Sequence, residues 1–385
     1  MNQPPYRSSG RTRSVSRRVS VRMHTRQSNR SMFADQRARR LPGAWFFLTL
    51  LLLLGGLGIY TAIDNNLLRV ETVSVTIPGM GRAFEGYTIL HISDLHGKRF
   101  GPAQSALQSA LRDRSYQVVC ITGDMIGQDE DPYPFYELID ALRPGVPVFF
   151  ILGDEDPQAV ISEPHYSNDV LAEFISGAQR HGATYLDAPR PLSVGGHTVW
   201  ILLESQLSLD MDAAEQSYRN QIQRDQAGGN AQLAGIKARM RALNYQLDVI
   251  NRVRAAREQM NQGDLYIALV HHPLQGDFVR GLQNWASPAN ASPYARQLDL
   301  VLAGHYNGGQ VRLPFLGPLY VPERGLSGRG WLPGDAVTQG LMQVGGVTQF
   351  VSPGLGVSHA YSIPFRLFNG PRVTLLRLTA SLPVQ

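Results

Sequence analysis

The sequence predicts an α/β fold preceded by a single membrane-spanning helix. Apolar, strand-like runs alternate with amphipathic, helix-like stretches along most of the chain, which is typical of a largely parallel sheet. Several of these runs end in an aspartate or a histidine. Near the N-terminus, the twenty residues 44–63 carry no charge. At ~1.5 Å rise per residue, a helix of this length crosses the hydrocarbon core of a bilayer.

Residues 1–43 form a tail that differs from the rest of the chain in charge. The first 40 residues hold eleven arginines and one acidic residue, Asp35, and so carry +10. The whole chain carries +5, which leaves −5 for the remainder, so we expect no nucleic-acid partner. We expect the polar tail to be disordered and cytoplasmic. The domain at 64–385 would then lie outside a bacterial inner or plasma membrane.

The predicted strands and helices follow in alternation. Strands are expected at 70–77, in "YTILHI", "YQVVCIT" and "VPVFFIL", and at 197–203, 265–270 and 299–303, with helices at 103–114 and 133–142. The glycine-rich tail from "QVRLP" to "PRVTLLRL" is strand-like and suggests a second sheet packed on the first. Residues 211–262 are rich in Ala, Gln and Arg and predict a helical hairpin broken at Gly228-Gly229. This insertion would pack on its own domain, or contact the membrane, a partner or a second copy.

Side chains that can bind metals follow five strand-like runs. They are Asp94 with His96, Asp124, Asp154, His271 and His305. The carboxyl ends of parallel strands share one sheet edge, so carboxylates and imidazoles from five junctions point to a metal site. In an extended segment the D-x-H spacing puts both donors on one face. Two ions ~3.5–4 Å apart can clamp a phosphoryl oxygen and activate a hydroxide.

These segments also resemble a known family. "SDLHG", "GD", "LGDED", "HHP" and "GHYNGGQ" are similar in order and spacing to the D-x-H, G-D, G-N-H-[D/E], H and G-H-x-H motifs of calcineurin-like metallophosphoesterases. The similarity covers about 70–205 and 263–380 and is greatest to the membrane-anchored or exported bacterial branch. It implies a four-layer α/β/β/α sandwich with two central sheets. It also implies two metal sites that share Asp124.

The resemblance assigns each ligand to a site. The first metal would take Asp94, His96, Asp124 and Asn307. The second would take Asp124, Asp154, His271 and His305; His271 fits the fourth motif better than His272. Three carboxylates, three imidazoles and one amide favour Mn²⁺ or Mg²⁺ over Fe or Zn. We therefore expect two divalent ions, with Mn²⁺ preferred and the first site weakened because Asn307 replaces a histidine.

Glu155 is the second departure from the family pattern. It stands where the family has a histidine that stabilises the transition state or protonates the leaving group. Glu155 would replace that catalytic group if nearby carboxylates keep it protonated; otherwise it caps a turn.

The expected function is a membrane-anchored, metal-dependent phosphoesterase that cleaves phosphodiester or diphosphate bonds with a two-metal-activated hydroxide. Members of the branch act on small molecules or lipid-linked precursors, including UDP-diacylglucosamine, so either class of substrate is expected. The alternative is a catalytically weakened or silent fold that acts as a binding module, for example through self-association of 211–262. Glu155 and Asn307 favour silence, whereas the retained aspartates and histidines favour activity.

Overall fold

The computed structural model describes residues 42–127, 129–164, 169–228, 233–285, 298–321, 330–333, 337–358 and 363–380. Nearly all of the arginine-rich tail, 1–43, lies outside these residues. The chain divides into two compact units, Met1–Leu53 and Leu54–Gln385. Helix α1, Pro42–Asn66, contains the 22 residues Trp45–Asn66, which are long and apolar enough to cross a membrane. The single apolar N-terminal helix is therefore present where the sequence predicts it.

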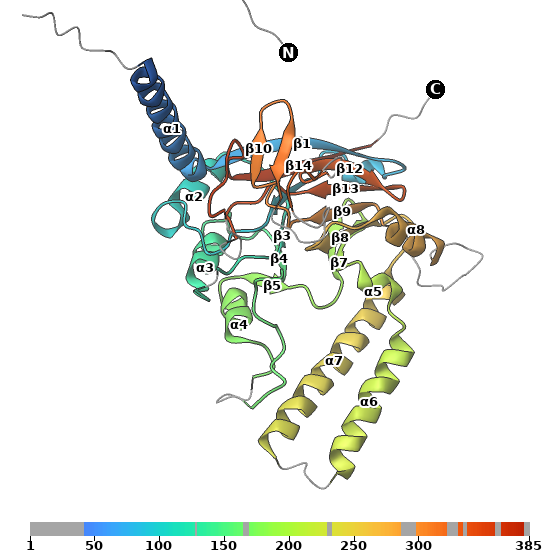
Figure 1. The fold of residues 1–385 in the computed structure, drawn as a ribbon. Coiled ribbons are helices and arrows are strands. Elements are labelled where there is room, and N and C mark those ends of the chain that lie inside the picture. The colour runs from blue at the N-terminus through green and yellow to red at the C-terminus, as the bar shows by residue number, and fades with distance from the viewer. Residues whose placement is uncertain are drawn as a thin grey trace, which may run out of the picture. The chain divides into compact units, whose positions relative to one another are not determined.

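The first sheet has six strands in the order β1-β14-β2-β3-β4-β5 (Figure 1). Their bounds are Arg69–Ile77 (β1), Thr88–Ile92 (β2), Val118–Thr122 (β3), Val148–Ile151 (β4), Ala183–Tyr185 (β5) and Arg372–Ala380 (β14). Neighbours from β2 to β5 pair in parallel. The runs "VVCIT" and "VFFI" are apolar without alternation because β3 and β4 are buried on both faces. The outer face is covered by α2 (Ser105–Leu111), α3 (Tyr133–Asp140) and α4 (Glu173–Arg180).

The second sheet also has six strands, in the order β12-β13-β9-β8-β7-β6. Their bounds are Arg190–Val194 (β6), His197–Leu203 (β7), Leu265–Val270 (β8), Leu300–Ala303 (β9), Gly340–Val344 (β12) and Val347–Val351 (β13). Strands β7, β8, β9 and β13 are parallel to their neighbours in this group. Helices α5 (Ser205–Ser208), α7 (Ala234–Gln259) and α8 (Gly276–Trp285) contribute to the core on its outer face.

The inner faces of the two sheets pack on each other. Val118, Cys120, Ile201, Ile267 and Leu300 are buried in one cluster there. Separate apolar clusters join each outer face to its helices. The fold is therefore the four-layer α/β/β/α sandwich expected from the sequence. Short 3₁₀ helices, η1 (Arg82–Phe84) and η2 (Pro102–Gln104), lie in the loops that follow β1 and β2.

The C-terminal part of the chain differs from the prediction of a separate sheet. Among the residues described in this part of the chain, only β12 and β13 join the second sheet, whereas β14 returns to the first and pairs with both β1 and β2. Between β9 and β12, the strands β10 (Val311–Leu313) and β11 (Gly317–Tyr320) form a separate hairpin. Apolar periodicity identifies these strands but does not encode which sheet each one joins.

The segment predicted as a helical hairpin contains α6, Met211–Ala227, and α7. Figure 1 shows the two helices lying side by side and extending away from the sheets. Asp187, in the loop after β5, anchors α7 to the domain: its carboxylate accepts hydrogen bonds from both terminal nitrogens of Arg252, at 2.7 and 2.9 Å, and from the hydroxyl of Tyr245. Burial alone would raise the pKa of Asp187, but these hydrogen bonds outweigh it and the pKa is lowered.

We predict that Asp187→Asn lowers the free energy of unfolding by about 2 kcal/mol at pH 7, because charge-assisted hydrogen bonds to Arg252 are lost. The folded-state pKa lies below the unfolded value of ~3.9, so the carboxylate's contribution is present above ~pH 4 and declines as pH falls further. Urea denaturation in detergent at pH 7 and pH 3 should show the difference shrinking. Asp212→Asn, whose side chain is 95% exposed, is the control; equal effects of the two changes would refute the anchor.

Candidate metal centre

Strands of both sheets end at one place and deliver the polar side chains there. Each of the following residues lies just beyond the carboxyl end of a strand: Asp94 after β2, Asp124 after β3, Asp154 after β4, His271 after β8 and His305 after β9. Strand β3 contacts β8 and β9 across the sheet interface, so the strand ends of the two sheets meet. This is the edge of an α/β sheet at which ligands bind.

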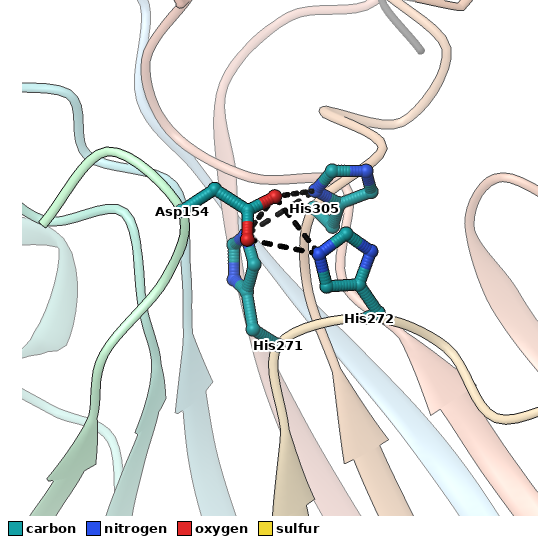
Figure 2. Close-up of side chains that lie close together, drawn as sticks. All are labelled: Asp154, His271, His272 and His305. Atoms are coloured by element: carbon teal, nitrogen blue, oxygen red, sulfur yellow. Dashed lines mark hydrogen bonds and ion pairs between the residues drawn. The ribbon is translucent and has the colours of Figure 1, made fainter. Parts of the chain in front are cut away.

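Asp154 is surrounded by three imidazoles (Figure 2). Its Oδ2 lies 2.8 Å from Nε2 of His272, 3.3 Å from Nδ1 of His305 and 4.0 Å from Nε2 of His271. The hydrogen bond with His272 is the main cause that lowers the pKa of Asp154. Burial and the neighbouring histidines lower the pKa of His305 to about 4, which leaves this imidazole neutral. One ionised carboxylate among imidazoles is a donor set suited to a divalent ion.

Asp124 lies between this group and the rest of the cluster. Its Oδ2 is 3.3 Å from Nε2 of His271 and 3.9 Å from Nε2 of His96. Burial would raise the pKa of Asp124, but its hydrogen bond with His271 and the histidine charges outweigh burial and lower it. The same pairing overcomes burial and raises the pKa of His271 to about 10. This central position is the one that a ligand shared by two ions requires.

Two buried oxygens in the cluster have no hydrogen-bond partner among the described residues. They are Oδ2 of Asp94 and Oδ1 of Asn307. A Cβ atom on Gly354 would lie 3.2 Å from the first and 3.3 Å from the second, so both oxygens border the same small space. Asn307 Nδ2 lies 3.4 Å from Nε2 of His96, which closes the group. Because buried polar atoms are normally paired, two orphaned oxygens beside an imidazole fit a bound cation.

Five of the clustered residues have strained backbones. Their φ angles are positive: Asp94 52°, His96 48°, Asp124 54°, His305 76° and Asn307 49°. Left-handed conformations of non-glycine residues cost of order 1 kcal/mol or more each and persist only where the surrounding structure imposes them. The chain therefore holds these side chains at a free-energy cost to stability, as functional sites commonly do.

Glu155 contacts His96 and does not have the protonated form considered from the sequence. Its Oε2 lies 3.0 Å from Nδ1 of His96, and Ser358 donates its hydroxyl to Oε1. Burial alone would raise the pKa of Glu155, but these hydrogen bonds and the His96 charge lower it. An ionised carboxylate only accepts hydrogen bonds, so Nδ1 of His96 carries the proton and Nε2 faces Asp124. A carboxylate behind a metal-binding histidine fixes the ring in this way.

The structure brings all seven side chains predicted as ligands into one cluster. It adds His272, which the sequence analysis set aside in favour of His271, and two residues that the sequence analysis did not consider. His272 joins Asp154, although only the "HHP" doublet hinted at it. Asp156 accepts backbone N–H groups of Asp124, Met125, Ile126 and Gly153 at 2.8–2.9 Å and so ties the end of β3 to that of β4. Ser358, which is 203 residues from Glu155 in sequence, gave no sequence signal.

Three comparisons relate this chain to known proteins. A family model described as calcineurin-like phosphoesterase matches residues 87–307, more than half of the chain. The chain belongs to this family. It is 32% identical over 84 residues to the metallophosphoesterase YkuE of Bacillus subtilis (strain 168), a match that spans 22% of this chain and 25% of that protein. A crystal structure of the phosphopantetheinyl hydrolase PptH from Mycobacterium tuberculosis aligns with 71% of this chain and 91% of its own, at 15% identity and a TM-score of 0.33.

We predict that Glu155→Ala weakens Mn²⁺ binding about 10–100-fold at one site, because His96 loses the acceptor that orients it. Glu155→Gln keeps an acceptor for Nδ1–H and should retain most of the affinity. Isothermal calorimetry of both variants measures the difference. Equal losses in the two variants would show that Glu155 acts through its charge alone, and no loss in either would refute the orienting role.

Proposed function

We propose that this chain is a membrane-anchored phosphoesterase that hydrolyses phosphodiester or diphosphate bonds with two divalent ions, Mn²⁺ being preferred. The observation that carries the proposal is the buried cluster around Asp124, in which oxygens of Asp94 and Asn307 meet no donor among the described residues. Family membership supports metal-dependent phosphoester chemistry. When bound, the ions would polarise the phosphoryl oxygens and lower the pKa of water.

The reaction adds water across a P–O bond. The water oxygen bonds to phosphorus, the leaving oxygen departs with the bonding electron pair, and the proton released by water balances the one that the leaving group takes up. Asp124 would be a ligand shared by the two metal sites, and Glu155 would keep the ring of His96 in its orientation through a hydrogen bond. Because the ionised Glu155 has no proton to give, the site favours leaving groups that are already weak bases, such as a diphosphate or an aryl oxide.

The same observation about Glu155 supports the alternative function. A family histidine that could protonate the leaving group is replaced by a carboxylate that accepts two hydrogen bonds. General acids contribute ~10²–10⁴-fold to such reactions. If the remaining catalysis is negligible, we propose that the chain acts as a binding module. Its partner would then be a second copy of the same chain, bound through α6 and α7.

The proposed location is a bacterial inner or plasma membrane, spanned once by α1. The arginines of the tail would stay in the cytoplasm and the phosphoesterase domain would lie outside. The proposed substrate is a small-molecule or lipid-linked phosphoester.

We predict that the full-length protein in detergent with Mn²⁺ hydrolyses bis(p-nitrophenyl) phosphate. EDTA and Asp124→Asn should each abolish the activity, while Asp131→Asn, outside the cluster, should leave it intact. At Mn²⁺ concentrations high enough to offset the weaker binding expected when His96 loses its acceptor, Glu155→His should raise the rate for an alkyl phosphodiester by up to ~10²–10⁴-fold and change a nitrophenyl ester little, because only the alkyl leaving group needs a proton. Asn307→His should tighten metal binding and help both substrates alike.

Two controls accompany this prediction: a check that each protein is folded, and the double variant that combines Glu155→His with Asn307→His. Circular dichroism should show that each protein is folded. If the wild type, both single variants and the double variant all fail to cleave any phosphoester with Mn²⁺ while remaining folded, the enzyme proposal is wrong and the binding module replaces it.

We predict that protease added to intact spheroplasts degrades residues 64–385, because the arginine-rich tail keeps the N-terminus inside. Immunoblotting with antibodies against the domain measures its survival, and a cytoplasmic protein serves as the control for intact cells. Full protection of the domain in intact spheroplasts, with degradation after lysis, would reverse the proposed orientation.

A further inference from the structure

A cavity of about 970 Å³ lies beside the metal centre. This volume is at the upper end of the ~300–1,000 Å³ typical of ligand pockets. It is lined by the face of α1 that carries Leu54, Leu57 and Gly58, and also by Phe365 and Leu367. Leu54 and Phe365 are 58% and 43% exposed, although both are large and apolar. The cavity thus offers an apolar surface that the described residues leave open.

The wall formed by α1 is fixed to the domain by specific contacts. Asn65 donates its side-chain amide to the backbone oxygen of Arg366 at 2.7 Å, and its Oδ1 accepts the backbone N–H of Arg366 at 2.9 Å. The rings of Tyr60 and Phe368 lie 5.3 Å apart. Residues from Leu54 onward belong to the same compact unit as the domain. The cavity is therefore part of the folded domain.

The apolar wall is also part of the helix that is long enough to cross a membrane. From Leu54 to Asn65 the helix rises ~16 Å, at ~1.5 Å per residue. Half of a ~30 Å hydrocarbon core is ~15 Å. With Trp45–Asn66 across a bilayer, the cavity would run along α1 for about the depth of one leaflet. A hydrocarbon chain could then enter it directly from the lipid.

The other end of the cavity is polar and reaches the metal cluster. His96, one of the clustered imidazoles, lines it together with Lys98 and Asp129. The ammonium of Lys98 donates a hydrogen bond to the backbone oxygen of Asn65 at the end of α1. A positive charge beside a metal centre suits a phosphate or diphosphate group.

We propose that this cavity binds the hydrocarbon chain of a lipid phosphoester, with the chain along α1 and the phosphate group between Lys98 and His96. The proposal rests on the proposed phosphoesterase function and names its substrate class. A lipid phosphoester would use all three adjoining features: the apolar cavity, the cationic side chain of Lys98 and the metal cluster. A tail-free phosphoester would use only the polar end.

Gly58 allows a direct test. A Cβ atom there meets nothing within 4 Å, so Gly58→Phe would place a ring in the cavity without a clash. Gly56→Phe is the matched control: its Cβ also meets nothing within 4 Å, but two residues turn the helix by ~200°, so it faces away. Both variants add the same apolar side chain to the same helix.

The full-length protein in phosphatidylcholine nanodiscs with Mn²⁺ is assayed with hexadecyl and methyl p-nitrophenyl phosphates, which share one leaving group. We expect a KM at least about tenfold lower for the hexadecyl ester, since burial of even two methylenes corresponds to about tenfold in affinity. Gly58→Phe should remove that advantage and leave the methyl ester unchanged, and Gly56→Phe should keep it. An unchanged preference in Gly58→Phe, or no preference in the wild type, overturns the proposal.

A binding measurement separates this proposal from the proposed function. Hexadecyl phosphate with a terminal diazirine is photolysed with the protein, and labelled peptides are identified by mass spectrometry. Labelling of the Leu57–Gly58 face that Gly58→Phe suppresses supports the tail site even if no ester is hydrolysed, in which case only the phosphoesterase function fails. Equal labelling all around α1 indicates bulk lipid and overturns the tail site, even if hydrolysis is observed.

Discussion

Burial of the Asp94 carboxylate is the constraint around which the site is built. One of its oxygens accepts the backbone N–H of His305 at 2.9 Å, while the other meets no donor among the described residues. An uncompensated buried charge costs several kcal/mol. The imidazoles of His96 and His271 approach the same space, and both lower the carboxylate's pKa against the larger effect of burial. A bound cation would pair with the Asp94 oxygen that no donor among the described residues reaches.

The sandwich fold brings together the side chains that surround Asp94. Parallel strands from two sheets bring their carboxyl ends to one edge, so donors separated by up to 213 positions, from Asp94 to Asn307, need only short loops to meet. The loops must turn sharply, which accounts for the left-handed backbones. Asp156 and Gly354 support the site. Asp156 accepts hydrogen bonds from four backbone N–H groups. Gly354 has no Cβ atom, which would otherwise fill the space beside Asp94.

In the proposed function, Glu155 links catalysis to substrate choice. As an ionised acceptor for His96 it would strengthen the metal site but would give no proton to a leaving group. Such a site suits diphosphates and similarly stable leaving groups. An apolar cavity that joins α1 to His96 would select among those substrates by their hydrocarbon chains. In this proposal, metal retention, the choice of leaving group and the choice of lipid chain would all depend on residues within one continuous region.

The sequence by itself determined the apolar helix, the alternation of strands and helices, and the set of donors at strand ends, because each depends on periodicity or on short motifs that are local in the chain. Only the tertiary structure decided that β14 returns to the first sheet, since apolar alternation does not encode strand partners. It likewise brought His272 to Asp154 and Ser358 to Glu155. The protonation state of Glu155 also depended on the fold, because a pKa follows from burial and neighbours that are distant in sequence.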